Sequence, residues 1–284
     1  MTDQYAVIGN PIAHSKSPLI HQQFAKQTGQ DISYERILAP LDGFEAKIHA
    51  LIKQGYKGVN VTVPFKFEAL KLVSQHGQVK PLAATAGAIN TMSFNADGSI
   101  VGDNTDGLGL VNDITHNLKF DIRHKKVLLL GSGGAAFGVL QPLLKANPSL
   151  IVIANRTFAK AEQAANVVLG LIQDKQMTTV CHAEPFDALG DTAFDLVINS
   201  TSTGLTDSAL PIPNSIFAAN SLAYEMMYGR DTPFMQQARA SGAQVADGLG
   251  MLVEQAAEAF YLWRGVRPKT HSVMQQIRDL SLGE

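Results

Sequence analysis

The stretch KKVLLLGSGGAAFGVL, residues 125–140, joins a short apolar run directly to a glycine-rich turn and then to a helix-forming segment. The apolar run 126–130 predicts a buried strand, because strands of a parallel sheet are covered on both faces. Gly131 allows a sharp turn after the strand, and the following helix directs its first N–H groups toward that turn. This order is typical of a doubly wound α/β domain that binds a dinucleotide.

The glycines of this turn also suit a pyrophosphate group. Gly133 and Gly134 have no side chain where an anion would approach the backbone, and the helix dipole adds a favourable potential. The alternative is a tight strand–helix turn without a ligand, because Gly-x-Gly alone is a weak motif. The predicted phosphate-binding residues are Gly131, Ser132, Gly133, Gly134 and Ala135.

The next apolar run, residues 151–154, leads into Asn155-Arg156-Thr157, with Lys160 one helical turn later. An NAD site would usually have Asp or Glu here to bind the ribose 2′-hydroxyl. Arginine can instead stack on adenine and pair with a phosphate. A solvated basic helix end is the alternative, but cations there oppose the helix dipole unless an anion is close. We therefore predict NADP, with Asn155, Arg156, Thr157 and Lys160 at its 2′-phosphate end.

Short β-rich runs alternate with helical patterns along nearly the whole chain, which predicts an α/β protein with mainly parallel sheets. In the first part, the predicted strands are residues 5–8, 33–38 and 59–63, followed by an edge hairpin at 89–94 and 100–102. In the second part, a helix is expected at 158–171, and the predicted strands are 126–130, 151–154, 179–181, 195–199 and 221–224.

Capping residues predict the limits of two helices in the first part. Pro18–Thr28 is expected to be helical with Ser17 as its N-cap and Gly29 after its last residue. Asp42 is expected to cap a second helix that ends before Gly55.

The chain is long enough for two domains, and the strand series restarts after a linking helix predicted at 107–118. We expect residues 1–106 to form an N-terminal open α/β domain that binds substrate. Residues 107–248 should form a Rossmann-type dinucleotide-binding domain. The apolar helical face of 249–263 has no strand after it, so 249–284 is expected to pack back on the first domain.

The composition excludes several classes of protein. Of 284 residues, 45% are hydrophobic and 17% charged, and the net charge is -2 without a basic cluster, which argues against disorder and nucleic-acid binding. Cys181 is the only cysteine, so an intrachain disulfide or a cysteine-based zinc site is excluded, and we predict no metal. The lack of a signal-like start or a long apolar run predicts a cytoplasmic protein without membrane contact. Monomer and homodimer both remain open.

A lysine and an aspartate are the predicted chemical groups. Thr62 and Lys66 lie at or just beyond the carboxyl end of the third predicted strand, where open α/β sheets bind ligands. A lysine there can polarise a ketone oxygen and donate a proton as hydride reaches the carbon. Asp106, in the segment that joins the two domains, is the candidate partner. The alternatives are a solvated surface lysine and an N-cap role that Asp106 would share with Asn104 and Thr105.

Further polar residues fit a small, hydroxylated anionic substrate. Ser15 and Ser17 offer two hydroxyls ahead of a helix, which suits a carboxylate, although Ser17 could serve only as a cap. Asn90 is expected within a strand, where an amide needs a partner.

Together these residues resemble the shikimate dehydrogenase family, and the resemblance covers essentially the whole chain in order. It is carried by eight short motifs, at residues 14–18, 60–66, 87–91, 102–107, 131–135, 155–157, 226–228 and 247–256. Ser132 and Lys160 depart from the family pattern, which often has alanine and arginine there. The lysine keeps the charge but lacks the planar fork of arginine, so a weaker preference for NADP is expected.

The resemblance implies reversible, NADP-dependent reduction of 3-dehydroshikimate to shikimate, a step toward chorismate and the aromatic amino acids. It implies that Lys66 is the acid and base, with Asp106 as its partner, and that Met226 and Gly248 lie beside the nicotinamide. It also implies that the substrate is bound by Ser15, Ser17, Thr62, Lys66, Asn90, Asp106, Tyr228 and Gln255.

Three alternatives remain open at this point. A quinate/shikimate dehydrogenase would accept an additional hydroxyl and NAD, although Arg156 argues against NAD. A methylenetetrahydrofolate dehydrogenase has a similar two-domain plan and a catalytic lysine, but a folate site would need aromatic stacking. A non-catalytic NADP-binding sensor would not need both Lys66 and Asp106.

Overall fold

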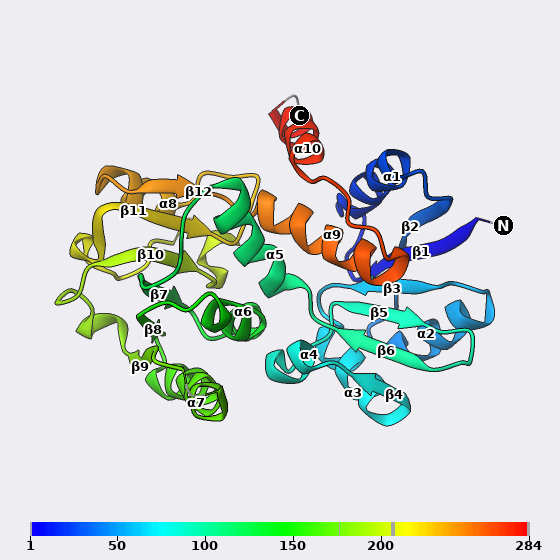
Figure 1. Cartoon of the computed structure of the whole chain (residues 1–284), viewed down its shortest axis with the longest axis horizontal. Coiled ribbons are helices and arrows are strands. Elements are labelled where there is room, and N and C mark those ends of the chain that lie inside the picture. Colours follow the sequence, from blue (N-terminus) through cyan, green and yellow to red (C-terminus); the bar gives the residue numbers. More distant parts are fainter. Residues whose placement is uncertain (1, 176, 206–207, 283–284) are drawn as a thin grey trace. The chain divides into compact units, whose positions relative to one another are not determined.

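The computed structural model describes residues 2–175, 177–205 and 208–282, and it contains two six-stranded sheets with their helices (Figure 1). The chain divides into two compact units. Unit 1 is Met1–Gly109 with Leu252–Glu284, and unit 2 is Leu110–Met251. The predicted junctions, after residue 106 and before residue 249, lie close to these limits. The predicted fold class is confirmed.

The sheet of unit 1 has the order β2-β1-β3-β5-β6-β4. Its strands are β1 (Asp3–Gly9), β2 (Ile32–Leu38), β3 (Gly58–Val61), β4 (Gly77–Val79), β5 (Thr91–Phe94) and β6 (Ile100–Asp103). Within the described residues, β5 alone runs antiparallel to its neighbours in this sheet.

The predicted hairpin of β5 and β6 forms, but its predicted position at the edge of the sheet is wrong. The short strand β4 pairs with the outer side of β6 and becomes the edge. Residues 77–79, GQV, are too few and too polar to show strand periodicity, so the sequence did not predict this strand.

The helices of unit 1 include α1 (Ser17–Thr28), α2 (Phe44–Lys53), α3 (Lys66–His76), α4 (Pro81–Ala86) and α10 (His271–Leu282). The long helix α9 (Leu249–Arg264) enters unit 1 at Leu252. Its end is fixed there because Trp263 stacks on Tyr5, with 4.6 Å between ring centroids, and donates from Nε1 to the Met92 carbonyl at 3.2 Å. The predicted return of the C-terminal helices to the first domain is therefore confirmed.

Both predicted N-caps are wrong. Ser17 is the first residue of α1, Lys16 occupies the N-cap position, and no side chain caps the helix. The Ser17 backbone N–H instead donates to Ser15 Oγ at 3.3 Å. Gly43 rather than Asp42 is the N-cap of α2, because the Gly43 N–H closes a turn onto Pro40 at 3.1 Å. The predicted end of α1 is confirmed, since Gly29 adopts a left-handed conformation with φ of 65°.

The sheet of unit 2 is parallel throughout its described pairs, in the order β12-β11-β10-β7-β8-β9. Its strands are β7 (Lys126–Leu130), β8 (Leu150–Ala154), β9 (Val180–Glu184), β10 (Phe194–Asn199), β11 (Phe217–Glu225) and β12 (Gln244–Ala246). The strand order reverses between β7 and β10. Doubly wound sheets bind ligands at the carboxyl ends of the strands at this point.

The helices of unit 2 are α6 (Gly134–Lys145), α7 (Phe158–Lys175) and α8 (Pro233–Ala240). The predicted linking helix begins as α5 (Asp106–Asn112) and continues as a π-helical turn, Asp113–Asn117. Short 3-10 turns occur at Phe186–Ala188, Ser202–Leu205 and Asn214–Ile216. Val127 and Leu129 of β7 pack into one core cluster and Leu128 and Leu130 into the other, which explains why 127–130 is apolar throughout.

Within the described residues, none of the helices combines the length and apolar character that a membrane crossing requires.

Candidate functional site

The predicted catalytic and substrate residues of unit 1 gather at one edge of its sheet. Thr62 lies one residue beyond β3, and Lys66 and Asp106 are the first residues of the helices that follow β3 and β6. Because these strands are parallel, their carboxyl ends meet at the same edge. The antiparallel strand β5 begins at this edge, which brings Asn90 to it. Asn90 lies in a bend before β5, so its predicted position within a strand is wrong.

Lys66 and Asp106 form a close ion pair. Lys66 Nζ lies 2.6 Å from Asp106 Oδ2, and the two side chains are 29% and 14% exposed. Phe65 is fully buried and stacks on Phe44, with 5.0 Å between ring centroids, and this fixes the start of α3. The Lys66 carbonyl accepts from the Ile89 N–H at 3.0 Å. The lysine is therefore anchored by its backbone and is not a freely solvated surface group.

The Asn104 side chain accepts from the first N–H of α5, so the Asp106 carboxylate is left for other contacts. Asn104 Oδ1 accepts from the Asp106 N–H at 3.1 Å, while its Nδ2 donates to the Ala88 carbonyl at 3.0 Å. Asp106 Oδ1 accepts from Asn90 Nδ2 at 2.8 Å. Both oxygens of Asp106 thus have a named partner, Lys66 on one side and Asn90 on the other.

The amide of Asn90 has one possible orientation. Its Oδ1 accepts from the Thr105 backbone N–H at 2.9 Å, and a backbone N–H can only donate. Its Nδ2 must therefore face Asp106 and, at 3.5 Å, Gln255 Oε1. Asn90 and Thr105 are 3% and 1% exposed, so these contacts are shielded from competing water.

A line of hydrogen bonds extends from Asn90 toward the start of α1. Thr91 Oγ1 donates to Asn90 Oδ1 at 2.9 Å and accepts from Asn60 Nδ2 at 3.0 Å. Tyr34 donates its hydroxyl proton to Asn60 Oδ1 at 2.7 Å. Burial raises the pKa of Tyr34, and the Ser17 side chain offsets part of this shift. The sequence prediction omitted Tyr34 and Asn60. A buried asparagine between Val59 and Val61 in β3 was the available signal.

The loop that carries Ser15 is held by an arginine that the sequence prediction also omitted. Arg36, on β2, donates from Nε at 2.9 Å and from Nη2 at 2.6 Å to the Ser15 carbonyl. The Ser17 N–H donates to Ser15 Oγ at 3.3 Å. Two bonds from a planar guanidinium to one carbonyl fix the loop and bring positive charge to it.

An aromatic cluster supports the same line of residues. The His21 ring is fully buried and stacks on Tyr34, with 4.1 Å between ring centroids and 5° between the planes. Burial lowers the pKa of His21 to about 3, and an interaction with Asn60 offsets part of this shift. His21 is therefore neutral at physiological pH.

The glycine turn of unit 2 has the form expected of a phosphate site. Gly131 has φ of +100°, and a Cβ there would lie 2.8 Å from Ser200 Oγ, so a larger residue would be strained and crowded. A Cβ on Gly133 would meet nothing within 4 Å, and Gly133 is the N-cap of α6. The buried hydroxyl of Ser132 has no hydrogen-bond partner. An open helix start with an unpaired hydroxyl fits a pyrophosphate.

The basic residues after β8 are exposed at the start of α7. Asn155 Nδ2 donates to the Thr157 carbonyl at 3.0 Å and shapes the turn. In the part of the chain that the structure describes, neither Arg156 nor Lys160 forms an ion pair with a carboxylate. These two cations thus remain available for an anionic ligand.

Met226 and Gly248 lie side by side through their backbones. The Gly248 N–H donates to the Met227 carbonyl at 2.9 Å. A Cβ on Gly248 would lie 2.1 Å from the Met226 carbonyl oxygen, so this approach requires glycine. Tyr228 follows on the same loop, and burial raises the pKa of its hydroxyl.

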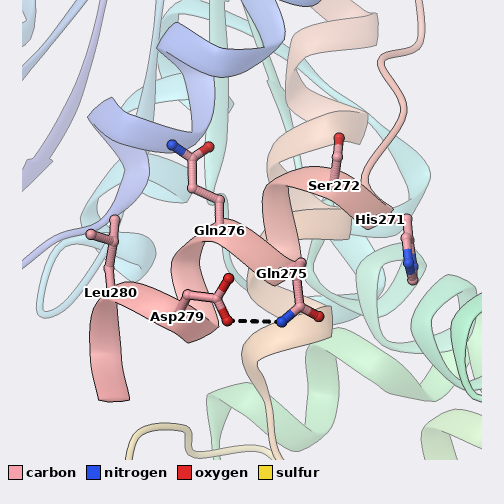
Figure 2. Close-up of a pocket in the computed structure, with 6 residues that line it drawn as sticks. All are labelled: His271, Ser272, Gln275, Gln276, Asp279 and Leu280. Carbon is pink, nitrogen blue, oxygen red and sulfur yellow. Dashed lines mark hydrogen bonds between the residues drawn. The ribbon is translucent and has the colours of Figure 1, made fainter. Parts of the chain in front are cut away.

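A separate open pocket lies along α10 in unit 1 and contains none of the predicted site residues (Figure 2). Gln275 Nε2 donates to Asp279 Oδ1 at 2.8 Å between neighbouring turns of α10.

Three family models match successive parts of the chain. They are the shikimate dehydrogenase substrate binding domain at residues 7–92, shikimate / quinate 5-dehydrogenase at 113–205, and the shikimate 5'-dehydrogenase C-terminal domain at 248–278. The three matched ranges follow one another along the chain and include parts of both units.

Individual relatives match over nearly the full length. The chain is 59% identical to the shikimate dehydrogenase (NADP(+)) of Methylobacillus flagellatus, over 97% of this chain and 99% of the relative. Its sequence is 46% identical to that of an Ael1 enzyme from Pseudomonas putida. The crystal structure of that enzyme matches with a TM-score of 0.88 over 97% of this chain and 98% of that one. It is 30% identical to shikimate 5-dehydrogenase from Thermus thermophilus in complex with NADP(H) and shikimate, with a TM-score of 0.82 over 98% and 99%. The chain therefore belongs to the shikimate dehydrogenase family.

Proposed function

We propose that this protein catalyses the reversible, NADP-dependent reduction of 3-dehydroshikimate to shikimate. The observation that carries this proposal is the Lys66–Asp106 ion pair, held at the carboxyl edge of an α/β sheet by a buried asparagine. Membership of the shikimate dehydrogenase family supports it, as do relatives named shikimate dehydrogenase (NADP(+)).

Lys66 is the acid and base of this mechanism. During reduction its ammonium group polarises the ketone oxygen and donates a proton to that oxygen as the ketone carbon receives hydride. In the reverse direction the neutral amine takes the proton from the hydroxyl. Asp106 stabilises the ammonium form at 2.6 Å and orients it. Lys66 is partly exposed, so it can exchange its proton with solvent between turnovers.

Substrate recognition relies on polar side chains that would be unpaired with the wrong ligand. Ser15 and Ser17 bind the carboxylate with Tyr228, next to the positive charge of Arg36. The ring hydroxyls are bound by Thr62, Lys66, Asn90, Asp106 and Gln255. Buried hydrogen-bonding groups discriminate strongly, because a ligand without the matching hydroxyl leaves them without a partner.

The cofactor residues fit NADP. Residues 131–135 hold the pyrophosphate at the start of α6, and Met226 and Gly248 lie beside the nicotinamide. Asn155, Arg156, Thr157 and Lys160 hold the 2′-phosphate, which gives the two unpaired cations an anionic partner. When bound, NADPH supplies the hydride that reduces the ketone.

The proposal also bears on oligomeric state and localisation. A single chain supplies all the proposed residues, so a monomer and a homodimer would both be active. A freely diffusing substrate and cofactor suit an enzyme of the cytoplasm.

A spectrophotometric assay tests the proposed reaction. Purified protein is given shikimate or quinate with NADP⁺ or NAD⁺, and absorbance at 340 nm is followed. Fast NADPH formation from shikimate with NADP⁺ is the expected result. Comparable rates with quinate or NAD⁺ would instead indicate a quinate/shikimate dehydrogenase. If NADP⁺ binds but no combination reacts, the protein is a sensor or uses another substrate.

A further inference from the structure

Glu225 is a fully buried carboxylate without a cationic partner. It ends β11, and its exposed fraction is 0%. Buried carboxylates are usually paired with a cation. The pKa of Glu225 is raised by burial and lowered only by neutral hydrogen-bond donors, so no lysine, arginine or histidine of the described residues compensates its charge.

Two side chains donate hydrogen bonds to one oxygen of Glu225. Asn199 Nδ2 lies 2.7 Å from Oε2, and Thr232 Oγ1 lies 3.0 Å from the same atom. Asn199 Oδ1 is occupied because it accepts from the Thr201 N–H at 3.1 Å. Thr232 Oγ1 accepts from the Met235 N–H at 3.3 Å, so its proton points to Glu225. The orientation of both groups is therefore fixed.

The other oxygen of Glu225 accepts from the Met227 N–H at 3.1 Å. Every contact thus donates to the carboxylate and none accepts from it. These three hydrogen bonds favour the charged form, because a carboxylate accepts from all of them at once, and they oppose the effect of burial. Burial makes that charge costly, which distinguishes Glu225 from an ordinary surface glutamate.

Glu225 lies directly before Met226, whose carbonyl is in close contact with Gly248. In the proposed function, Met226 and Gly248 lie beside the nicotinamide. An oxidised nicotinamide ring carries a positive charge, whereas the reduced ring is neutral. A fixed negative charge in a buried, weakly screened position stabilises the positive ring and has little effect on the neutral one.

We propose that the Glu225 carboxylate favours binding of the oxidised cofactor over the reduced one and thereby promotes hydride donation from NADPH. This inference rests on the proposed function, because it takes the nicotinamide to lie against Met226 and Gly248. Its effect is electrostatic.

The test compares the affinities of NADP⁺ and NADPH without substrate, by calorimetry and by NADPH fluorescence. Glu225→Gln removes the charge with little change in size. We expect the ratio of the dissociation constants, NADP⁺ over NADPH, to rise about tenfold. Glu225→Asp keeps the charge and should retain the wild-type ratio within about twofold. Thr232→Val removes one hydrogen bond to Glu225 but no charge, and it should also retain the ratio.

An equal loss of affinity for both cofactor forms in Glu225→Gln, or no loss, would overturn the inference and leave Glu225 a structural residue. Failure to bind either form in the wild type would instead contradict the proposed function. If Glu225→Gln does not fold, the wild-type protein with ¹³C-labelled glutamate carboxyls provides the test. NADP⁺ should lower the pKa of Glu225 relative to NADPH, and identical titration curves would overturn the inference.

Discussion

Lys66 Nζ lies 2.6 Å from Asp106 Oδ2. This ion pair joins the first residue of α3 to the first residue of α5. The second oxygen of Asp106 is held by Asn90, whose amide is itself fixed by the Thr105 N–H. The proton donor is therefore oriented by a chain of contacts that ends in the backbone. Such preorganisation keeps a catalytic group in place without reorganisation during the reaction.

Asp106→Asn should lower kcat/KM for shikimate by about 100-fold or more. The amide has one acceptor where the carboxylate has two, so its NH₂ group must face either Lys66 or Asn90, both donors. NADP⁺ affinity, measured by calorimetry, should stay within about twofold. Asp97→Asn, in the exposed turn between β5 and β6, is the control. If Asp106→Asn retains wild-type kcat/KM, the carboxylate is not needed as the partner of Lys66.

Arg156→Ala should weaken NADP⁺ binding by about tenfold or more while changing NAD⁺ binding little, because only NADP⁺ carries the 2′-phosphate. Lys160→Ala should have a smaller effect, since an ammonium makes no forked contact. Arg123→Ala, which removes an exposed arginine already paired with Asp121, is the control. The measurement is calorimetry with each cofactor. Equal losses for NADP⁺ and NAD⁺ would refute the 2′-phosphate assignment.

Arg36→Met should raise KM for shikimate by about tenfold with a smaller change in kcat, because charge-assisted hydrogen bonds hold the Ser15 carbonyl. Arg36→Lys keeps the charge but not the two-bond contact, so an intermediate KM is expected. Initial rates over a range of shikimate concentrations separate the two constants. An unchanged KM in Arg36→Met would show that the arginine does not influence the substrate site.

His21 should make the fold acid-sensitive. The pKa of His21 falls to about 3 in the folded protein, against an unfolded value of ~6.5. Between these values the unfolded chain binds the proton and the folded chain does not. The contribution of neutral His21 to the free energy of unfolding is therefore fully present above pH 6.5 and is lost as pH falls toward 3.

His21→Phe keeps a ring against Tyr34 and removes this titration. From pH 7 to pH 4 the wild type should lose about 3 kcal/mol of unfolding free energy more than the variant does. Urea unfolding at several pH values measures both curves. Parallel curves for the two proteins would mean that His21 does not contribute to acid sensitivity.

Local patterns predicted the elements that depend on local chemistry. The strand 126–130 was found with its observed limits, because an apolar run that stops at a glycine turn has few other interpretations. The last residue of α1 was also found, because Gly29 takes the left-handed conformation. The caps at Ser17 and Asp42 were not, since the Ser17 N–H turns back to Ser15 Oγ in one case and the Gly43 N–H closes a turn onto Pro40 in the other.

Local sequence patterns did not predict the side-chain contacts between neighbouring strands. Arg36 reaches the Ser15 carbonyl only because β2 pairs with β1, and Tyr34 reaches Asn60 across the same sheet. The spacing of residues in the chain does not specify this register. The sequence suggested Asp106 as the partner of Lys66, and the family resemblance placed Asn90 at the same substrate site. Their mutual hydrogen bonds required the folded chain.

The most direct test of the central claim is the turnover number of Lys66→Met in the 340 nm assay with shikimate and NADP⁺. Lys71→Met makes the same change at an exposed lysine of α3 and serves as the matched control. If Lys66 carries the proton, kcat should fall by about 100-fold or more in Lys66→Met, while NADP⁺ affinity stays nearly unchanged and Lys71→Met behaves as the wild type. Wild-type turnover in Lys66→Met would contradict the proposed role of the Lys66–Asp106 pair.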